Sequence, residues 1–309
     1  MNRLAGIIVA ALGLVVAILS ITKIVPHLTQ TGVEMILFGG LIIGLSFIEK
    51  PDSEGTERMS TGSTLGNIFF APSDVFRNLR RHPRWLVALL VMSILSTAYS
   101  NLFMERLGAD RVANFAIDKT LEIGLIANNE EAKKGIEDGR ADAIEQAINP
   151  VARSGEAVSS FARSVFGYCF LSLIFMLFMM AMGGKLHFWQ AFSATIYASF
   201  PVSVIRHLLN TLLLYLKDPT DIHPILGQQN LIQDNLSFLV TSAQNPVIYT
   251  LLASFSVLMF YWLWMNATGL KNAGEKVSGT AAWSASIGIF VVMLLLGVTM
   301  AALFPSFMS

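Results

Sequence analysis

RNLRRHPRWLVALLVMSILSTAYSNLFM, residues 77–104, places four arginines directly before an uncharged apolar run that starts at Trp85. A hydrocarbon core about 30 Å thick needs about 20 apolar residues in a helix, and residues 85–104 supply them. Arginine gathers at one mouth of a membrane-spanning helix because its charge stays with water and lipid headgroups. The segment therefore predicts a transmembrane helix with a strongly basic entrance.

Six further apolar runs of similar length flank this one, so about seven transmembrane helices are expected. The chain is 54% hydrophobic and 14% charged, with a mean hydropathy of +0.59. Soluble domains carry about 25% charged residues. The net charge is zero, which gives no indication of nucleic-acid binding. We expect an all-α polytopic membrane bundle with spans at 5–25, 31–48, 85–104, 161–182, 189–216, 246–268 and 281–304.

The first two spans form an N-terminal hairpin over residues 1–48. Gly40 and Gly44 make a G-x-x-x-G pattern, which favours close helix packing. Glu34 near the entrance of the second span has two interpretations, an interfacial carboxylate that reaches water or an intramembrane proton site. Residues 49–67 are polar and rich in Gly, Ser and Thr, which predicts a flexible cytoplasmic linker.

A short amphipathic helix is predicted over residues 73–82. Its apolar face carries Phe76 and its opposite face carries basic side chains, a pattern typical of helices that lie in the headgroup plane. The arginines have two interpretations, anchors that orient the adjacent span or a docking surface for a partner. Candidate lipid- or partner-binding residues are Phe69, Phe76, Arg77, Arg80, Arg81, Arg84 and Trp85.

Two polar regions interrupt the later spans. Residues 106–160 show helical spacing on both sides of an Asn-Asn break, which predicts a helical hairpin outside the membrane. Residues 217–245 form a polar loop, in which Asp218, Asp221 and His223 are of metal-ligand type but lie beside prolines that favour turns. We therefore predict a turn there, and no metal site and no cofactor in the chain.

The fifth span is unusual because Pro201 is expected to break it and Arg206-His207 lie within it. If residues 189–208 cross the membrane, Arg206 reaches one surface. If residues 197–216 cross it, Arg206 lies near the middle and needs a partner, for which Glu34 is one choice.

Cytoplasmic loops carry the excess of lysine and arginine, which sets the orientation. With residues 49–84 inside, Arg3 and the loops with Lys185 and Lys271 are also inside. The insert 106–160, the loop 217–245 and the C-terminus then lie outside. The sequence carries no H-E-x-x-H, G-x-S-x-G or P-loop pattern, so no catalytic residues are predicted.

Three stretches carry a resemblance to the Yip family, the Ypt/Rab-interacting membrane proteins, in its bacterial branch. They are IFFAPSDVF (68–76) running into HPRW (82–85), WQAFSATIYASFP (189–201) and GLKNAG (269–274). The resemblance covers residues 68–304. It implies a non-enzymatic five-helix membrane domain with its N-terminal side in the cytoplasm. Eukaryotic members act with small GTPases, but this chain has a hairpin and linker in place of their long cytosolic region.

Two functions follow from these features. The first is a scaffold or accessory subunit of a membrane complex in the bacterial cytoplasmic (inner) membrane. The resemblance implies an ABC-type export system, with its permease or adaptor as the partner. The lipid bilayer with anionic headgroups is a further expected partner, and a homo-oligomer is left open. The second is a transporter or channel for small solutes or ions, motivated by Pro201, Arg206 and His207.

Overall fold

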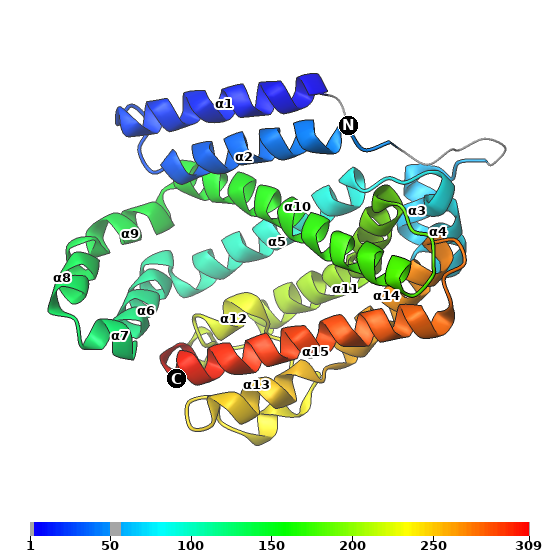
Figure 1. Cartoon of the computed structure of the whole chain (residues 1–309). Helices are drawn as coiled ribbons and strands as arrows, with labels where there is room; N and C mark the ends of the chain where they lie inside the picture. Colours follow the sequence, from blue (N-terminus) through cyan, green and yellow to red (C-terminus); the bar gives the residue numbers. More distant parts are fainter. Residues whose placement is uncertain (1–2, 50–56, 309) are drawn as a thin grey trace. The chain divides into compact units, whose positions relative to one another are not determined.

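Figure 1 shows the chain as a computed structural model that describes residues 3–49 and 57–308, almost all of them in helices or short connections. The helices are α1 (Arg3–Ile21), α2 (Thr29–Leu45), α3 (Thr61–Asn67), α4 (Pro72–Arg81), α5 (Leu86–Leu107), α6 (Ala109–Leu121), α7 (Gly124–Ala127), α8 (Glu130–Asp138), α9 (Arg140–Ile148), α10 (Pro150–Ala181), α11 (Phe188–Leu216), α12 (Leu226–Gln229), α13 (Pro246–Ser254), α14 (Val257–Ala273) and α15 (Gly279–Leu303), with 3₁₀ turns η1 (Pro219–Asp221), η2 (Leu236–Leu239) and η3 (Pro305–Met308).

Helices stand at all seven predicted spans. Within the described residues, α1, α5, α10, α11 and α15 are each long and apolar enough to cross a bilayer. Helices α13 and α14 are apolar enough only when taken together, and they bend by 49° at their junction, so they form either one broken span or a re-entrant loop. The predicted single helix over 246–268 is in fact two. The seventh position, α2, has 17 residues, slightly short of a full crossing. The chain is therefore an all-α integral membrane protein.

The chain folds into two compact units. The first contains residues 1–93, 150–201 and 264–286, and the second contains residues 94–149, 202–263 and 287–309. In the first unit α1 and α2 run side by side as the predicted hairpin (Figure 1). Glycines set their distance: a Cβ added at Gly6 would lie 2.8 Å from the carbonyl oxygen of Gly39, and one added at Gly13 would lie 2.7 Å from that of Gly32.

Gly40 and Gly44, the predicted helix-packing pair, contact no other helix among the described residues of this chain. An added Cβ at either residue would meet nothing within 4 Å. The reason is helical geometry. Gly32 and Gly39 are seven residues apart, which is two turns, so both face α1; Gly40 is rotated by about 100° from Gly39 and faces away.

Helix α10 packs on α2 within the first unit, through Gly155 near Thr31 and a buried hydrogen bond from Ser159 to the Thr31 hydroxyl at 3.3 Å. Arg163 of α10 forms an ion pair with Glu34 at 2.9 Å. Glu34 is thus an ion-pair partner for α10, which neither of its two predicted interpretations included. It was also one choice as a partner for Arg206, whereas its carboxylate is held by Arg163.

The predicted linker over 49–67 is only partly a linker. Residues 50–56 lie outside the described residues, but 61–67 form α3, capped by the Ser60 hydroxyl, which accepts a hydrogen bond from the Ser63 amide. Helix α4 begins at Pro72 and ends at Arg81, one residue earlier at each end than the predicted amphipathic helix.

The second unit contains residues 106–149 of the predicted insert and the 217–245 loop. The insert holds four helices, α6 to α9, in place of a hairpin, and α10 already begins at Pro150. Arg140 ties it together by donating to Asn114 at 3.0 Å and Asp118 at 2.7 Å. The apolar core of this unit consists of Tyr99, Phe103, Leu107, Val112, Leu214, Ile222 and Leu231.

Helix α11 is continuous through Pro201, so the predicted break at this proline is wrong. A proline removes one backbone hydrogen bond. Membrane helices tolerate this loss where neighbouring groups compensate for it. The break in the sequence of spans lies instead between α13 and α14, at Phe255 and Ser256.

Candidate functional site

The three stretches that carry the family resemblance meet in the first unit. They are the segment 68–85 with α4, the start of α11 and the end of α14, and we call their meeting point the motif cluster. The apolar side chains that the segment buries in the cluster are Ile68, Val75, Phe76 and Leu79, all of which are fully buried. Val75, Phe76 and Leu79 lie on one face of this short helix and hold α4 against its neighbours.

Gly269 of α14 lies directly against the ring of Phe76. A Cβ added at Gly269 would stand 3.1 Å from two of the ring carbons. Any larger residue would push α4 away, so glycine at this position permits the close approach of the two helices. The GLKNAG stretch is therefore explained by packing against the first stretch.

The start of α11 binds the other end of α4. The Gln190 side chain donates to the carbonyl oxygen of Arg80 at 2.9 Å, which satisfies one of the carbonyls left free at a helix C-terminus. Trp85 packs on Phe192 with ring centroids 5.1 Å apart, and Phe69 packs edge-on against Phe200 at 6.0 Å. The WQAFSATIYASFP stretch thus packs against the segment 68–85 and holds it in place.

Arg84 points into the cluster. Its guanidinium donates to the carbonyl of Met59 at 2.6 Å, to the hydroxyl of buried Thr64 and to the Asn78 side chain at 3.3 Å. Burial lowers the pKa of Arg84 from its ordinary value, but an arginine remains charged at neutral pH. Arg84 therefore joins α3 and α4 from inside.

Arg80 binds an acidic residue that follows the third stretch. Its guanidinium lies 2.7 Å from the Glu275 carboxylate. The hydrogen bond and charge of Arg80 lower the pKa of Glu275, and the charges of Arg81 and Lys185 lower it further. Glu275 is also clasped through its backbone, because its amide donates to the Lys185 carbonyl at 2.6 Å and its carbonyl accepts from the Lys185 amide at 2.7 Å.

Arg77, Arg81 and Lys185 are exposed cations of the cluster. Arg77 and Arg81 lie one helical turn apart on α4, and Arg81 and Lys185 both act on Glu275, so we call these three residues the basic group. The Arg77 side chain is 65% exposed, although it lies 3.4 Å from the Asp74 carboxylate. Phe70, just before α4, is 89% exposed. The arrangement offers positive charge and an aromatic ring to an anionic partner or lipid.

A comparison with family models matches residues 66–302 to the Yip1 domain. The chain belongs to the Yip1 family. The match covers the motif cluster and all helices from α4 to α14, whereas the hairpin α1–α2 lies before it. Comparisons with curated proteins and with solved structures gave no match.

In this Yip1 protein the predicted candidates separate into two groups. Phe76, Arg80 and Arg84 hold the cluster together from inside, and Phe69 and Trp85 are half-buried in aromatic pairs. They therefore support the basic group and are not themselves a free docking surface. Arg77 and Arg81 are exposed.

Sequence reasoning missed the partners of these arginines. Glu275, Lys185 and Gln190 lie about 100 to 200 positions beyond α4 in the sequence. The only local signal is that Glu275 directly follows the GLKNAG stretch. No residue spacing connects two loops so far apart, and only the folded chain shows the clasp.

The intramembrane candidates of α11 lie in the second unit. Arg206 is half-buried, and His207 is held by its own helix, because its Nδ1 donates to the Ser203 carbonyl at 2.7 Å. Asn210, one turn further, is buried and accepts a hydrogen bond from the Leu231 amide at 2.9 Å. These contacts place polar groups along one helix of the second unit.

The predicted turn at 217–245 is confirmed. Asp218 caps η1 and accepts hydrogen bonds from the Thr220 hydroxyl at 2.6 Å and from the Thr220 amide at 2.8 Å, and both lower the pKa of Asp218, the hydroxyl more than the amide. His223 Nδ1 accepts from the amides of Ile225 and Leu226 at 3.2 Å each. Both side chains therefore serve the backbone of the loop.

Proposed function

We propose that this protein is a non-enzymatic scaffold or accessory subunit of a membrane complex, and that the basic group is where it docks. The observation that carries this proposal is the construction of the motif cluster. Buried Phe76 and Gln190 and half-buried Arg84 fix α4 in place, while Arg77, Arg81 and Phe70 are exposed. A pre-organised charged surface binds at a lower entropic cost than a mobile one.

We further propose that the protein lies in the bacterial cytoplasmic (inner) membrane with its N-terminus inside and its C-terminus outside. The clasp between Lys185 and Glu275 supports this orientation, because it joins the α10–α11 loop to the α14–α15 loop. These two loops and α4 contain the cations that the positive-inside rule assigns to the cytoplasm. With this orientation, the insert of α6 to α9 lies outside.

The partner that we propose is the permease or the adaptor of an ABC-type export system, following the association that the family resemblance implies for bacterial members. Charge complementarity supports an acidic patch on that partner. The segments 68–85, 183–189 and 269–278 together carry seven arginines and lysines against two carboxylates. Such an excess steers an acidic surface toward the cluster and discriminates against a basic one.

The test is cross-linking in native membranes, followed by purification in mild detergent and mass spectrometry. The variant Arg77→Glu/Arg81→Glu reverses the basic group, and the matched control Lys133→Glu/Lys134→Glu makes the same charge change on α8. We expect a permease or adaptor to be recovered with the wild type and the control, and to be reduced about tenfold with the α4 variant. Equal recovery from all three, or recovery of the chain only with copies of itself or with lipid, would contradict the proposal.

A second candidate is a transporter or channel in its own right. The bend of 49° between α13 and α14 favours it, because interrupted spans create polar sites at membrane depth in many transporters. The polar residues Arg206, His207 and Asn210 on α11 belong to the same unit as that bend. The sequence alone showed no second interrupted span.

Flux into reconstituted vesicles tests this candidate. Arg206→Leu is expected to abolish flux, and Arg206→Lys, which keeps the charge, is expected to retain part of it. Vesicles that stay sealed to ions and small solutes with the wild-type protein would rule the candidate out.

A further inference from the structure

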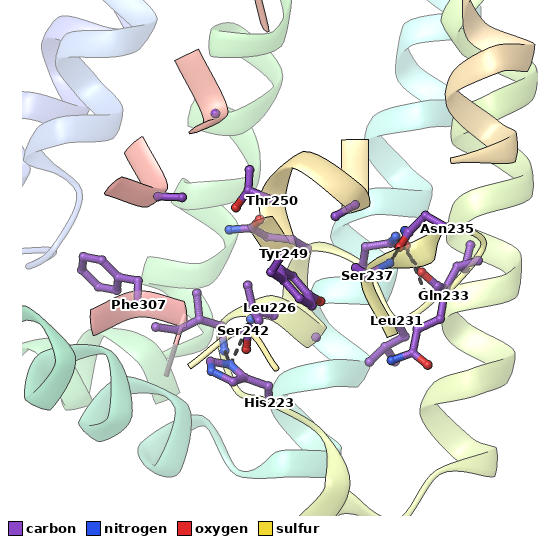
Figure 2. Close-up of a pocket in the computed structure, with 18 of the residues that line it drawn as sticks. His223, Leu226, Leu231, Gln233, Asn235, Ser237, Ser242, Tyr249, Thr250 and Phe307 are labelled. Atoms are coloured by element: carbon purple, nitrogen blue, oxygen red, sulfur yellow. Dashed lines mark hydrogen bonds between the residues drawn. The ribbon is translucent and has the colours of Figure 1, made fainter. Parts of the chain in front are cut away.

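The second unit contains a cavity of about 890 Å³ lined in part by the 217–245 loop. Its walls come from that loop, from α13 and from the end of α15 with the η3 turn. Figure 2 shows Tyr249 and Thr250 near its centre, with Phe307 to one side and Gln233 and Asn235 to the other. Its volume lies within the 300–1,000 Å³ range of small-molecule sites.

The floor of this cavity is pre-formed. Buried Tyr99 donates to the Gly227 carbonyl, and buried Asn210 accepts from the Leu231 amide at 2.9 Å. A Cβ added at Gly227 would stand 2.7 Å from the Ile222 side chain, so the loop also packs tightly beneath the floor. Helix side chains thus fasten the loop, and the cavity is not a gap left by a loose segment.

The lining combines apolar walls with a few hydrogen-bonding groups. The apolar side includes Leu226, Met300 and Phe304. The hydroxyl of Thr250, a residue of the lining, is buried and has no hydrogen-bond partner in the structure. A buried hydroxyl without a partner is costly, and a ligand that bonds to it would remove that cost.

The cavity lies where a membrane helix ends. Met300 and Ala301 belong to the last turn of α15, a span of 25 residues, which is longer than the hydrocarbon core is thick. Beside the cavity, η2 exposes three large apolar side chains, Leu236, Phe238 and Leu239, and α13 exposes Ile248. Exposed apolar groups at such a level reach into the bilayer, so the rim of the cavity adjoins lipid.

We propose that this cavity binds the hydrocarbon chain of a membrane amphiphile with an uncharged polar head, such as a monoacylglycerol. The chain lies along the apolar wall, and the head hydrogen-bonds to Thr250 and to the amides of Gln233 and Asn235. An uncharged head fits because Lys217 and Asp221, the two charged residues of the lining, are of opposite sign. The proposal does not depend on the scaffold function.

The test is photolabelling of the full-length protein in lipid vesicles with a diazirine-bearing monoacylglycerol, followed by peptide mapping. We expect labels on residues 246–254 and 297–307, reduced about tenfold by excess unlabelled monoacylglycerol. Gly297→Leu fills the cavity, because an added Cβ there meets only Thr250, at 3.6 Å. Gly288→Leu, on the same helix with nothing within 4 Å, is the matched control.

Gly297→Leu is expected to lose the competed labelling and Gly288→Leu to keep it. Thr250→Val keeps the shape of the side chain and removes the hydroxyl, so it is expected to weaken labelling while leaving the thermal transition in place. Labelling that excess ligand does not reduce, or that Gly297→Leu leaves intact, overturns the proposal. If a probe of equal chain length with a carboxylate head labels these peptides better, the proposal that the ligand has an uncharged head is wrong.

Discussion

The motif cluster and the cavity region differ in how completely side chains fill the space between their elements. In the cluster, side chains fill the space between α4, α11 and α14, and Gly269 and Gly274 leave no room for a Cβ. In the cavity region, Tyr99 and Asn210 fasten the loop equally firmly, but about 890 Å³ stays open above it. The comparison teaches that sequence motifs in this protein mark tight packing, whereas open space is lined by residues without any motif.

The strongest test of this difference in packing is to replace one glycine by valine in each region. Gly274→Val places a Cβ 2.5 Å from the Val277 side chain and 3.2 Å from the Lys185 carbonyl. We expect a loss of about 3 kcal/mol from overpacking. Gly297→Val is expected to cost little. Thermal unfolding in detergent, followed by tryptophan fluorescence, measures both; equal effects would mean that the two regions are packed alike.

The second prediction concerns the arginine inside the cluster. Arg84→Met leaves the Met59 carbonyl and the Thr64 hydroxyl without their donor, so we expect a loss of about 2 kcal/mol. Arg77→Met removes an exposed arginine from the same segment and should change stability by less than about 0.5 kcal/mol. If Arg77→Met destabilised the protein as much in the same unfolding assay, the division into buried frame and exposed basic group would be wrong.

The third prediction concerns the floor of the cavity. Tyr99→Phe removes the donor to the Gly227 carbonyl, which we expect to cost about 1 kcal/mol. Hydrogen exchange of residues 223–231 should accelerate, because the loop loses one of its fastenings. Exchange in residues 183–190 of the motif cluster is the internal control. Unchanged exchange at 223–231 would show that Tyr99 is not needed to hold the loop.

The smallest effect is expected from the Glu275 carboxyl. Its pKa lies below the ordinary value of 4.5, so the folded state favours the ionised form. Its contribution to stability is present above that value and is lost as the pH falls through the lowered pKa. Wild type should therefore exceed Glu275→Gln in melting temperature at pH 7, and the difference should vanish on acidification. A difference that grows in acid would reverse the sign of this interpretation.

The sequence predicted the helix positions well because apolar runs alone determine where membrane helices form. It also predicted the apolar face of α4, since Val75, Phe76 and Leu79 follow helical spacing. The sequence did not predict contacts whose second residue lies far away along the chain. Arg80 turns toward Glu275, and Gly39, not Gly40, faces α1, because the position of a neighbour decides which face is used.

The start of α10 shows a signal that was present but overlooked. The small residues Ala152, Gly155, Ser159 and Ala162 recur at intervals of three and four, and all are buried. This is the spacing of one helix face. The insert, predicted over 106–160, therefore ends before Pro150, and residues 150–160 belong to the long helix. The cavity, by contrast, had no such signal, because its walls come from four separate segments.

The backbone clasp between Lys185 and Glu275 is indifferent to the identity of the two side chains, since only amides and carbonyls take part. A substitution at Lys185 therefore keeps both backbone hydrogen bonds, whereas a substitution at Glu275 keeps them but removes the ion pair with Arg80. The charge of the surface at the Lys185 loop can therefore change by substitution of Lys185 while the two backbone hydrogen bonds persist. Such a change would alter which partner binds there without altering the fold.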